Sequence, residues 1–323
     1  MSAAPVFADA GNVRVHLEYG RCIAAVREAM IALSSGQAVH IPRSVIPLDN
    51  KVFALMPGSL GLLGAFGVKA ISVVDDPDHA GRQAHLGAVL LFDPVDGRLT
   101  CVADAEEITT IRTAAASALA TDLLARPDAQ TLGIFGSGRQ ARAHVRAIAC
   151  VRKLEKVWIW GRTLERATQA AEELARETGL AVEATKDAPQ AARADILCTV
   201  TTSPTPVVFG EWVLPGAHVN LVGSHRRGYF EVDRALVLRS LYFADSRASV
   251  MIEAGEFLEA LEAGALDERF LRAEIGQIAS GTAAGRTDAN EITIYKSHGH
   301  AVQDLAATKI VYESMVEQMN KAP

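Results

Sequence analysis

Hydrophobic residues in the first third of the chain follow two different periods. Residues 18–35 carry them at three- and four-residue spacing, which predicts an amphipathic helix. Shorter apolar runs end at turns rich in Asp and Pro, and such runs are typical of strands in an antiparallel sheet. These runs are residues 67–74 and 87–92. An alanine-rich run over residues 109–124 predicts a second helix, with Thr109 or Thr110 as its N-cap.

From residue 131 onward, short apolar runs alternate with helical patterns. This alternation predicts an α/β fold in which helices connect the strands of a parallel sheet. The expected strands are residues 131–135, 157–160, 181–184, 195–200, 218–222, 241–243 and 292–296. The expected helices are residues 140–151, 163–178, 188–193, 250–263 and 301–319, and residues 276–290 form a polar, glycine-rich stretch.

A G-x-G-x-x-A motif, residues 136–141, lies between the first of these strands and the helix that follows. Gly136 permits a tight turn, and Gly138 lets the backbone approach a pyrophosphate. Ser137, Arg139 and Gln140 complete the turn, and the free N–H groups of the helix N-terminus favour an anion. The motif and its context predict a bound dinucleotide. The alternative is a glycine turn in another kind of α/β domain.

The residues after the second strand indicate which dinucleotide binds. NAD-binding units usually place a carboxylate there, to accept from the ribose hydroxyls. This chain has Gly161, Arg162 and Thr163 instead, and a guanidinium suits a 2′-phosphate. We therefore expect NADP(H) to be favoured over NAD(H). The alternative is that Arg162 is a solvated loop residue and that backbone groups hold NAD(H).

Other strand ends supply candidates for the nicotinamide half of the cofactor. Ligands of open parallel sheets bind beyond the carboxyl ends of the strands. Thr199, Val200 and Thr201 end one strand, and Val222 ends the next. These residues are expected to line the nicotinamide or its ribose, unless they are ordinary strand residues.

Bulk composition narrows the class of protein. The 323 residues are 49% hydrophobic and 22% charged, with a formal net charge of −6 and no basic block, which argues against a nucleic-acid partner. The four cysteines form no C-x-x-C pair, so neither a metal site nor a disulfide framework is indicated. No signal-peptide pattern and no membrane-length apolar stretch is seen. We expect a soluble, cytoplasmic protein.

Together these marks resemble the ornithine cyclodeaminase/mu-crystallin family. The resemblance runs from Arg21 to the C-terminal helix, and its further marks are residues 67–69, 87–94, 111–117, 161–163 and 299–308. It implies a substrate-binding and dimerisation domain at 1–115, joined by the C-terminal helix 300–323, and a Rossmann-type dinucleotide-binding domain at 116–299. It also implies a homodimer, a small amino or imino acid as substrate, and cofactor contacts from Thr113 and Gly299.

The same resemblance assigns roles to three cations. Arg43 and Arg112 would hold the substrate carboxylate, and Lys69 would hydrogen-bond that carboxylate or donate a proton. A lysine among other cations can have a depressed pKa and so act as acid or base. Structural alternatives stay open: Arg112 could form an ion pair near its helix, and Arg43 could be a surface loop residue.

The chain departs from the family's cyclodeaminases at His225. Those enzymes usually carry an aspartate there, which pairs with the distal ammonium of ornithine, and ketimine reductases often do not. His225, followed by two arginines, would oppose an ammonium and could instead donate a proton to an imine nitrogen. Alternatively, the only role of His225 could be to form hydrogen bonds with backbone groups. His85 is a weaker candidate, and Ala84 replaces a hydroxyl residue of many members.

These observations favour an NAD(P)H-dependent reductase of cyclic imino acids such as pyrroline-2-carboxylate or piperideine-2-carboxylate. Three alternatives remain. The first is ornithine cyclodeaminase, which releases ammonia without net cofactor consumption. The second is a dehydrogenase of a linear amino acid such as alanine. The third is a non-catalytic NADPH-binding protein.

Overall fold

The computed structural model describes residues 4–49, 51–75, 83–224 and 227–321. The chain divides into two compact units. The first unit is Met1–Thr113 together with Gly299–Pro323, and the second is Ala114–His298. The division falls within the helix α3, Ala105–Leu124.

The first unit is built on a seven-stranded sheet in the order β1-β7-β6-β5-β4-β2, with β3 paired to β4. Its pairs are antiparallel apart from β1 on β7. The strands are β1 Val6–Ala8, β2 Val39–His40, β3 Ser44–Leu48, β4 Lys51–Ser59, β5 Phe66–Asp75, β6 Gln83–Phe92 and β7 Leu99–Asp104. The helices are α1 Ala10–His16, α2 Tyr19–Ser34, the short η1 Gly61–Leu63, the start of α3, and α11 Ala301–Lys321.

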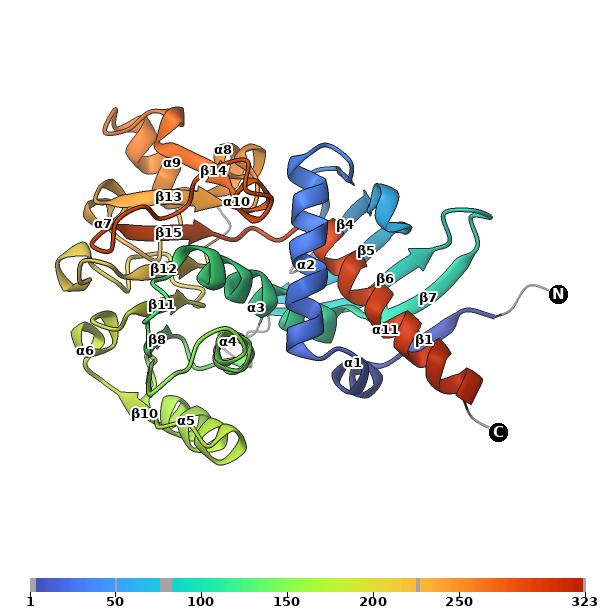
Figure 1. Cartoon of the computed structure of the whole chain (residues 1–323), viewed down its shortest axis with the longest axis horizontal. Helices are drawn as coiled ribbons and strands as arrows, with labels where there is room; N and C mark the ends of the chain where they lie inside the picture. The colour runs from blue at the N-terminus through green and yellow to red at the C-terminus, as the bar shows by residue number, and fades with distance from the viewer. Residues whose placement is uncertain (1–3, 50, 76–82, 225–226, 322–323) are drawn as a thin grey trace. The chain divides into compact units, whose positions relative to one another are not determined.

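Side chains along β5 alternate between a buried and a partly exposed face, as the pleat requires. Lys69 and Ile71 lie on the buried face, whereas Val68 and Ala70 lie on the other. The helix α11 packs against α2, β4 and β5, and Figure 1 shows α11 (red) beside α2 (blue). The antiparallel sheet and the helix at 18–35 were thus predicted, while β1 and α1 were not.

The helix α3 begins four residues earlier than the sequence predicted. The Asp104 carboxylate accepts from the Glu107 N–H at 2.7 Å, so Asp104 caps this end. Thr109 and Thr110 lie inside the helix, and their hydroxyls donate to carbonyls four residues back. The prediction of a threonine N-cap was wrong because an aspartate upstream already supplies the acceptor.

The second unit contains an eight-stranded, all-parallel sheet in the order β10-β9-β8-β11-β12-β15-β13-β14. Figure 1 shows this order from β14 at the top to β10 at the bottom. The strands are β8 Thr131–Phe135, β9 Lys156–Trp160, β10 Val182–Thr185, β11 Ile196–Thr199, β12 His218–Leu221, β13 Ser240–Ala244, β14 Leu271–Glu274 and β15 Ile292–Lys296. The connecting helices include α4 Arg139–Ala149, α5 Leu164–Thr178, α6 Ala188–Ala192 and α7 Arg234–Leu238, with the short η3 Gly210–Trp212.

The strand order reverses between β8 and β11. From β8 the chain moves outward to β9 and β10, then returns to the other side of β8 at β11 and continues to β12. Right-handed crossovers therefore place α4 and α5 on one face of the sheet and α6 on the opposite face. A reversal of this kind opens a crevice beyond the carboxyl ends of β8 and β11.

One predicted helix is two helices in the structure. Residues 250–263 form parts of α8 Arg247–Glu253 and α9 Gly255–Glu262, separated at Ala254, whose ψ of 90° is not helical. In the first turn of α9 the Glu256 side chain is buried, and it accepts from the Tyr242 hydroxyl at 2.8 Å. After α9 come the short η4, Glu268–Phe270, and the strand β14. The strand β14 was not predicted. The polar stretch that follows contains a short helix, α10 Ile275–Ala279.

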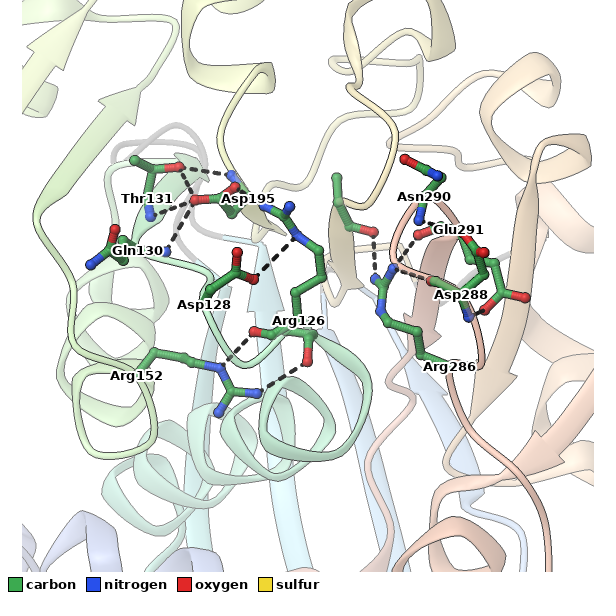
Figure 2. Close-up of polar contacts among 12 residues, drawn as sticks. Arg126, Asp128, Gln130, Thr131, Arg152, Asp195, Arg286, Asp288, Asn290 and Glu291 are labelled. Carbon is green, nitrogen blue, oxygen red and sulfur yellow. Dashed lines mark hydrogen bonds and ion pairs between the residues drawn. The ribbon is translucent and has the colours of Figure 1, made fainter.

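Two arginines hold the C-terminal end of α3; Figure 2 labels both of them, Arg152 and Arg286. Arg152 donates to the carbonyls of Ala125 at 3.2 Å and Thr121 at 3.0 Å, and Arg286 donates to that of Leu124 at 2.7 Å. Cations at this end also complement the helix dipole. A surface hollow of about 280 Å³ at this end of α3 is lined by Arg286 and Arg126. Arg286 donates to backbone carbonyls, and Arg126 forms an ion pair with Asp195.

Candidate active site

Predicted cofactor residues of the second unit gather at the carboxyl edge of its parallel sheet. They directly follow β8, β9, β11 and β12, and parallel strands end at the same edge. The residues concerned are Gly136, Ser137, Gly138, Gly161, Arg162, Thr163, Val200, Thr201 and Val222, with Arg139 and Gln140 opening α4 and Thr199 ending β11.

The glycine turn has the geometry of an anion-binding loop. Gly136 has a φ of 130°, and a Cβ there would lie 2.9 Å from the Val200 carbonyl, so only glycine fits. Gly138 is the N-cap of α4, and nothing lies within 4 Å of the position a Cβ would take. That open space beside the first N–H groups of α4 fits a pyrophosphate.

Arg142, which the sequence did not single out, fastens the glycine turn. Its Nη1 donates to the Ser137 carbonyl at 2.9 Å and to the Gly138 carbonyl at 3.3 Å. Its Nε donates to Glu173 of α5 at 2.8 Å. Arg142 therefore connects the two carbonyls of the turn to a carboxylate of α5.

The end of β9 presents cations to solvent. Arg162 and Arg166 are both exposed, and Thr163 is the N-cap of α5 without a side-chain capping bond. A helix N-terminus with two arginines and a hydroxyl around it suits a phosphate group. Glu165 is the acidic residue of this first turn.

A buried carboxylate connects the loops after β11 and β12. Glu231 is 1% exposed and accepts from the Thr201 N–H and hydroxyl, both at 2.7 Å. It also accepts from the Thr199 hydroxyl at 2.8 Å, the Gly223 N–H at 2.7 Å and the Ser224 N–H at 3.2 Å. Glu231 therefore fixes the backbone of both predicted nicotinamide-side loops, and no sequence motif marked it.

Gly223 is required by the same arrangement. A Cβ at this position would overlap the Thr201 carbonyl and lie 2.5 Å from Glu231 Oε1.

Burial raises the pKa of the Glu231 carboxyl, whereas its hydrogen bonds and the Lys296 charge oppose this shift. Lys296 donates to the Ser224 hydroxyl at 2.7 Å and pairs with Glu256 at 3.2 Å.

His225 lies outside the described residues, and the same holds for Arg226. The next residue, Arg227, forms an exposed ion pair with Glu262 at 2.8 Å. Nothing is described of the His85 side chain, although its backbone pairs with Val73 in the antiparallel sheet. The roles of both histidines stay predictions.

Two predicted substrate residues meet in the first unit around a buried aspartate. Arg112 Nε lies 2.8 Å from Asp304 Oδ1, and Lys69 Nζ lies 3.3 Å from the same oxygen. Lys69, Arg112 and Asp304 are 2%, 5% and 0% exposed. Arg112 Nη1 also donates to Gln303 Oε1 at 2.9 Å. Lys69 and Arg112 are thus buried together, and Asp304 was not predicted.

The charge state of Lys69 is set by this environment. Burial lowers its pKa from 10.5 to about 8, and the charges of Arg112 and Arg43 add to the effect while Asp304 opposes it. Burial raises the pKa of Asp304, but Arg112 and Lys69 outweigh this and hold it below its ordinary value. Two buried cations sharing one carboxylate oxygen form a site suited to a second small anion.

Arg43 and the two remaining predicted residues also belong to the first unit. Arg43 is half-buried and acts electrostatically on Lys69. Gly299 has a φ of 77°, and a Cβ there would lie 2.5 Å from Arg112 Nη1, so this glycine makes room for the guanidinium. Thr113 is 8% exposed and follows Arg112 in α3.

Comparison with known proteins identifies the family. A model of the ornithine cyclodeaminase/mu-crystallin family matches residues 3–319. The chain belongs to this family. It is 33% identical to the ketimine reductase mu-crystallin of Mus musculus over 320 residues, which cover 97% of this chain and 98% of that one.

Two solved structures share the fold over nearly their whole length. One is the Δ1-pyrroline-2-carboxylate reductase of Thermococcus litoralis in complex with NADH and L-proline, with a TM-score of 0.91 and 31% identity; the match covers 97% of this chain and 98% of that one. The other is an archaeal alanine dehydrogenase dimer with bound NAD, with a TM-score of 0.90 and 28% identity over 98% and 97% of the two chains. The Rossmann-type α/β fold expected from the sequence is confirmed.

The helices in the described part of the chain bear on the membrane expectation. None of the helices there combines the length and the apolar character that crossing a bilayer requires. The long helices α3 and α11 carry charged residues instead.

Proposed function

We propose that this chain is an NAD(P)H-dependent reductase of small cyclic imino acids, such as pyrroline-2-carboxylate or piperideine-2-carboxylate. The observation that carries the proposal is the buried pair of Lys69 and Arg112 around Asp304, because such a cluster selects a small carboxylate. The family supports it, since its members include a ketimine reductase and a Δ1-pyrroline-2-carboxylate reductase that binds NADH and L-proline.

In this mechanism the protein supplies orientation and charge. Arg112, Lys69 and Arg43 hold the substrate carboxylate, and burial strengthens the interactions of Arg112 and Lys69 by excluding water. A bound nicotinamide dinucleotide supplies the hydride that reduces the C=N bond. Lys69 also carries a proton whose pKa of about 8 suits exchange with the substrate near neutral pH. His225 is a second candidate proton donor.

The second candidate function is ornithine cyclodeaminase, which the family name includes. A cyclodeaminase must stabilise the distal ammonium of ornithine, and position 225 carries a histidine followed by two arginines rather than a carboxylate. Positive charge at this position opposes an ammonium. The sequence of this loop therefore favours a reductase.

One set of assays separates the candidates. Oxidation of NADPH and NADH is followed with pyrroline-2-carboxylate, piperideine-2-carboxylate, and pyruvate plus ammonia, and ammonia release is measured with ornithine. Cofactor oxidation with a cyclic imino acid is the expected result. Ornithine-dependent ammonia release without imine turnover would refute the proposal. The Lys69→Ala variant should lose imine turnover and keep its affinity for the cofactor.

The cofactor preference is a finer part of the proposal. We infer that NADP(H) is favoured, because exposed Arg162 and Arg166 and the free N-terminus of α5 follow β9 where NAD-binding units usually place a carboxylate. Arg162→Asp should shift the ratio of kcat/KM from NADPH toward NADH by tenfold or more, which is about 1.4 kcal/mol. An unchanged ratio would contradict the 2′-phosphate assignment, and Arg176→Asp at the far end of α5 is the control.

We also propose that the chain forms a homodimer through the outer face of the antiparallel sheet. Ile46, Phe53, Ser72 and Leu86 form a row across β3, β4, β5 and β6, because each is the register partner of the next. Ile46 and Leu86 at the ends of the row are 50% and 52% exposed. Exposed apolar side chains such as Ile46 and Leu86 on one sheet face are typical of a protein interface, and the similar alanine dehydrogenase is a dimer.

A further inference from the structure

The second oxygen of Asp304 is the feature that the proposed carboxylate site does not use. Both cations contact Oδ1. Oδ2 is buried and has no hydrogen-bond partner among the residues that the structure describes. A buried carboxylate oxygen without a donor is costly, so it points to a donor that the described residues do not supply. The side chain is 0% exposed, which means that water does not replace that donor freely.

The missing donor can be deduced from the chemistry of the substrate. In a cyclic 2-imino acid, the ring nitrogen and the carboxylate carbon are bonded to the same carbon atom. A carboxylate held by Lys69 and Arg112 therefore brings the ring nitrogen within a few ångströms of the aspartate that both cations contact. The neighbouring side chains do not supply this donor: Gln303 accepts from Arg112 and donates to Met30 Sδ, and the printed contacts of both cations are to Oδ1.

We propose that Asp304 Oδ2 accepts a hydrogen bond from the protonated ring nitrogen of the imino acid, which makes Asp304 a catalytic residue. This assignment rests on the proposed reductase function. It gives Asp304 two tasks: Oδ1 positions the cations that bind the carboxylate, and Oδ2 stabilises the iminium form of the substrate.

The reaction balances in this arrangement. Hydride with its two electrons would come from a C–H bond of the reduced nicotinamide, which is oxidised, and would form a C–H bond at the imine carbon. The π electron pair of C=N moves onto the nitrogen and cancels its positive charge. The N–H bond that faces Oδ2 is retained, so the product is a neutral secondary amine and no proton has to arrive during the hydride step. A carboxylate beside the nitrogen favours the protonated imine, which is the better hydride acceptor.

Two planar acids of nearly equal shape test the hydrogen bond without any reaction. Pyrrole-2-carboxylate presents an N–H beside its carboxylate, and furan-2-carboxylate presents an oxygen acceptor at the same place. Dissociation constants for both are measured by calorimetry on the full-length protein. The wild-type protein should bind the pyrrole acid at least tenfold more tightly than the furan acid.

The matched variants are Asp304→Asn and Glu107→Gln. The asparagine keeps an oxygen for Arg112 and Lys69 and replaces Oδ2 by an N–H donor, so the preference should disappear or reverse. Glu107 is another buried carboxylate of the first unit paired with an arginine, Arg14, at 3.0 Å, and its variant should keep the wild-type preference. Circular dichroism and NADPH affinity confirm that both variants are folded.

The outcomes separate the two proposals. Equal binding of the two acids by the wild-type protein, or a preference that survives in Asp304→Asn, overturns the role of Asp304 even if imine turnover is observed. A protein that binds neither acid and reduces no cyclic imine overturns both the reductase function and this inference.

Discussion

Lys69 combines a role that the family resemblance predicts with an environment that only the folded chain creates. Its ion pair with Asp304 joins residues that lie 235 positions apart in the sequence. Burial and the Arg112 charge explain why its pKa lies near 8 rather than 10.5. The charge of the Lys69 side chain should therefore change within the pH range of ordinary assays.

The binding of a substrate-like carboxylate should therefore depend on pH. Below about pH 8 Lys69 is protonated and attracts the anion, and above that value it becomes neutral. The Kd of furan-2-carboxylate, which has no titrating nitrogen, should rise about tenfold or more as the pH increases from 7 to 9.5, since charge-assisted hydrogen bonds contribute roughly 1.5–3 kcal/mol. In Lys69→Arg the Kd should stay level across this range. A wild-type Kd independent of pH would contradict the lowered pKa.

Glu231 gives a prediction about stability. Replacing it with glutamine puts an amide donor among the N–H groups and hydroxyls of Thr201, Gly223 and Thr199, so the free energy of unfolding should fall by about 1–3 kcal/mol.

The control for Glu231 is Glu291, which accepts from Thr287 and Asp288 in the same way but lies nearer the surface. The Glu291→Gln substitution should lower the free energy of unfolding by less, because water can replace the hydrogen bonds of this carboxylate. Denaturant titration of both variants measures the difference, and equal losses would show that burial is not the cause.

At the scale of single elements, the glycine turn and α4 were predicted from the motif, but the support of the turn was not. Arg142 and Arg146 lie one turn apart on α4, and each forms an ion pair with a glutamate of α5, Glu173 at 2.8 Å and Glu177 at 2.6 Å. Only Arg142 also donates to the carbonyls of the turn. The two ion pairs thus differ in whether the arginine also contacts the glycine turn.

Arg142→Gln should weaken NADPH binding about tenfold, because the turn loses the cation that fixes two of its carbonyls; this loss corresponds to about 1.4 kcal/mol. Arg146→Gln removes a similar ion pair and should leave the affinity within about twofold, since exposed ion pairs contribute little. Fluorescence titration with NADPH measures both. Equal effects in the two variants would assign the change to helix packing rather than to the turn.

Element boundaries show where local patterns reach their limit. The strands 131–135 and 292–296 were predicted to the residue, because apolar runs buried on both faces end abruptly at glycine or polar residues. The start of α3 and the break at Ala254 were missed. Each depends on a single side chain, Asp104 as a cap and Glu256 as a buried acceptor, whose effect is not periodic.

At the scale of the whole molecule, dimerisation gives a further prediction. Ile46→Glu places a charge in the exposed row of the antiparallel sheet and should convert the dimer to a monomer at micromolar concentration, since a buried unpaired charge costs several kcal/mol. Ile252→Glu makes the same change at another exposed position, on α8 of the second unit, and should remain dimeric. Light scattering after size exclusion measures both masses, and a dimeric Ile46→Glu would place the interface elsewhere.

The sequence by itself determined the α/β fold and the strand-helix context of the glycine turn, and it predicted Lys69 and Arg112 as substrate-binding cations. These follow from patterns spanning a few residues or from the family resemblance, and both are present before folding. Only the tertiary structure showed that Asp304 lies between those cations and that Glu231 joins two loops. The reason is physical: a carboxylate in an amphipathic or polar stretch looks like a solvated residue until donors distant in the sequence surround it, and its burial and partners exist only in the folded chain.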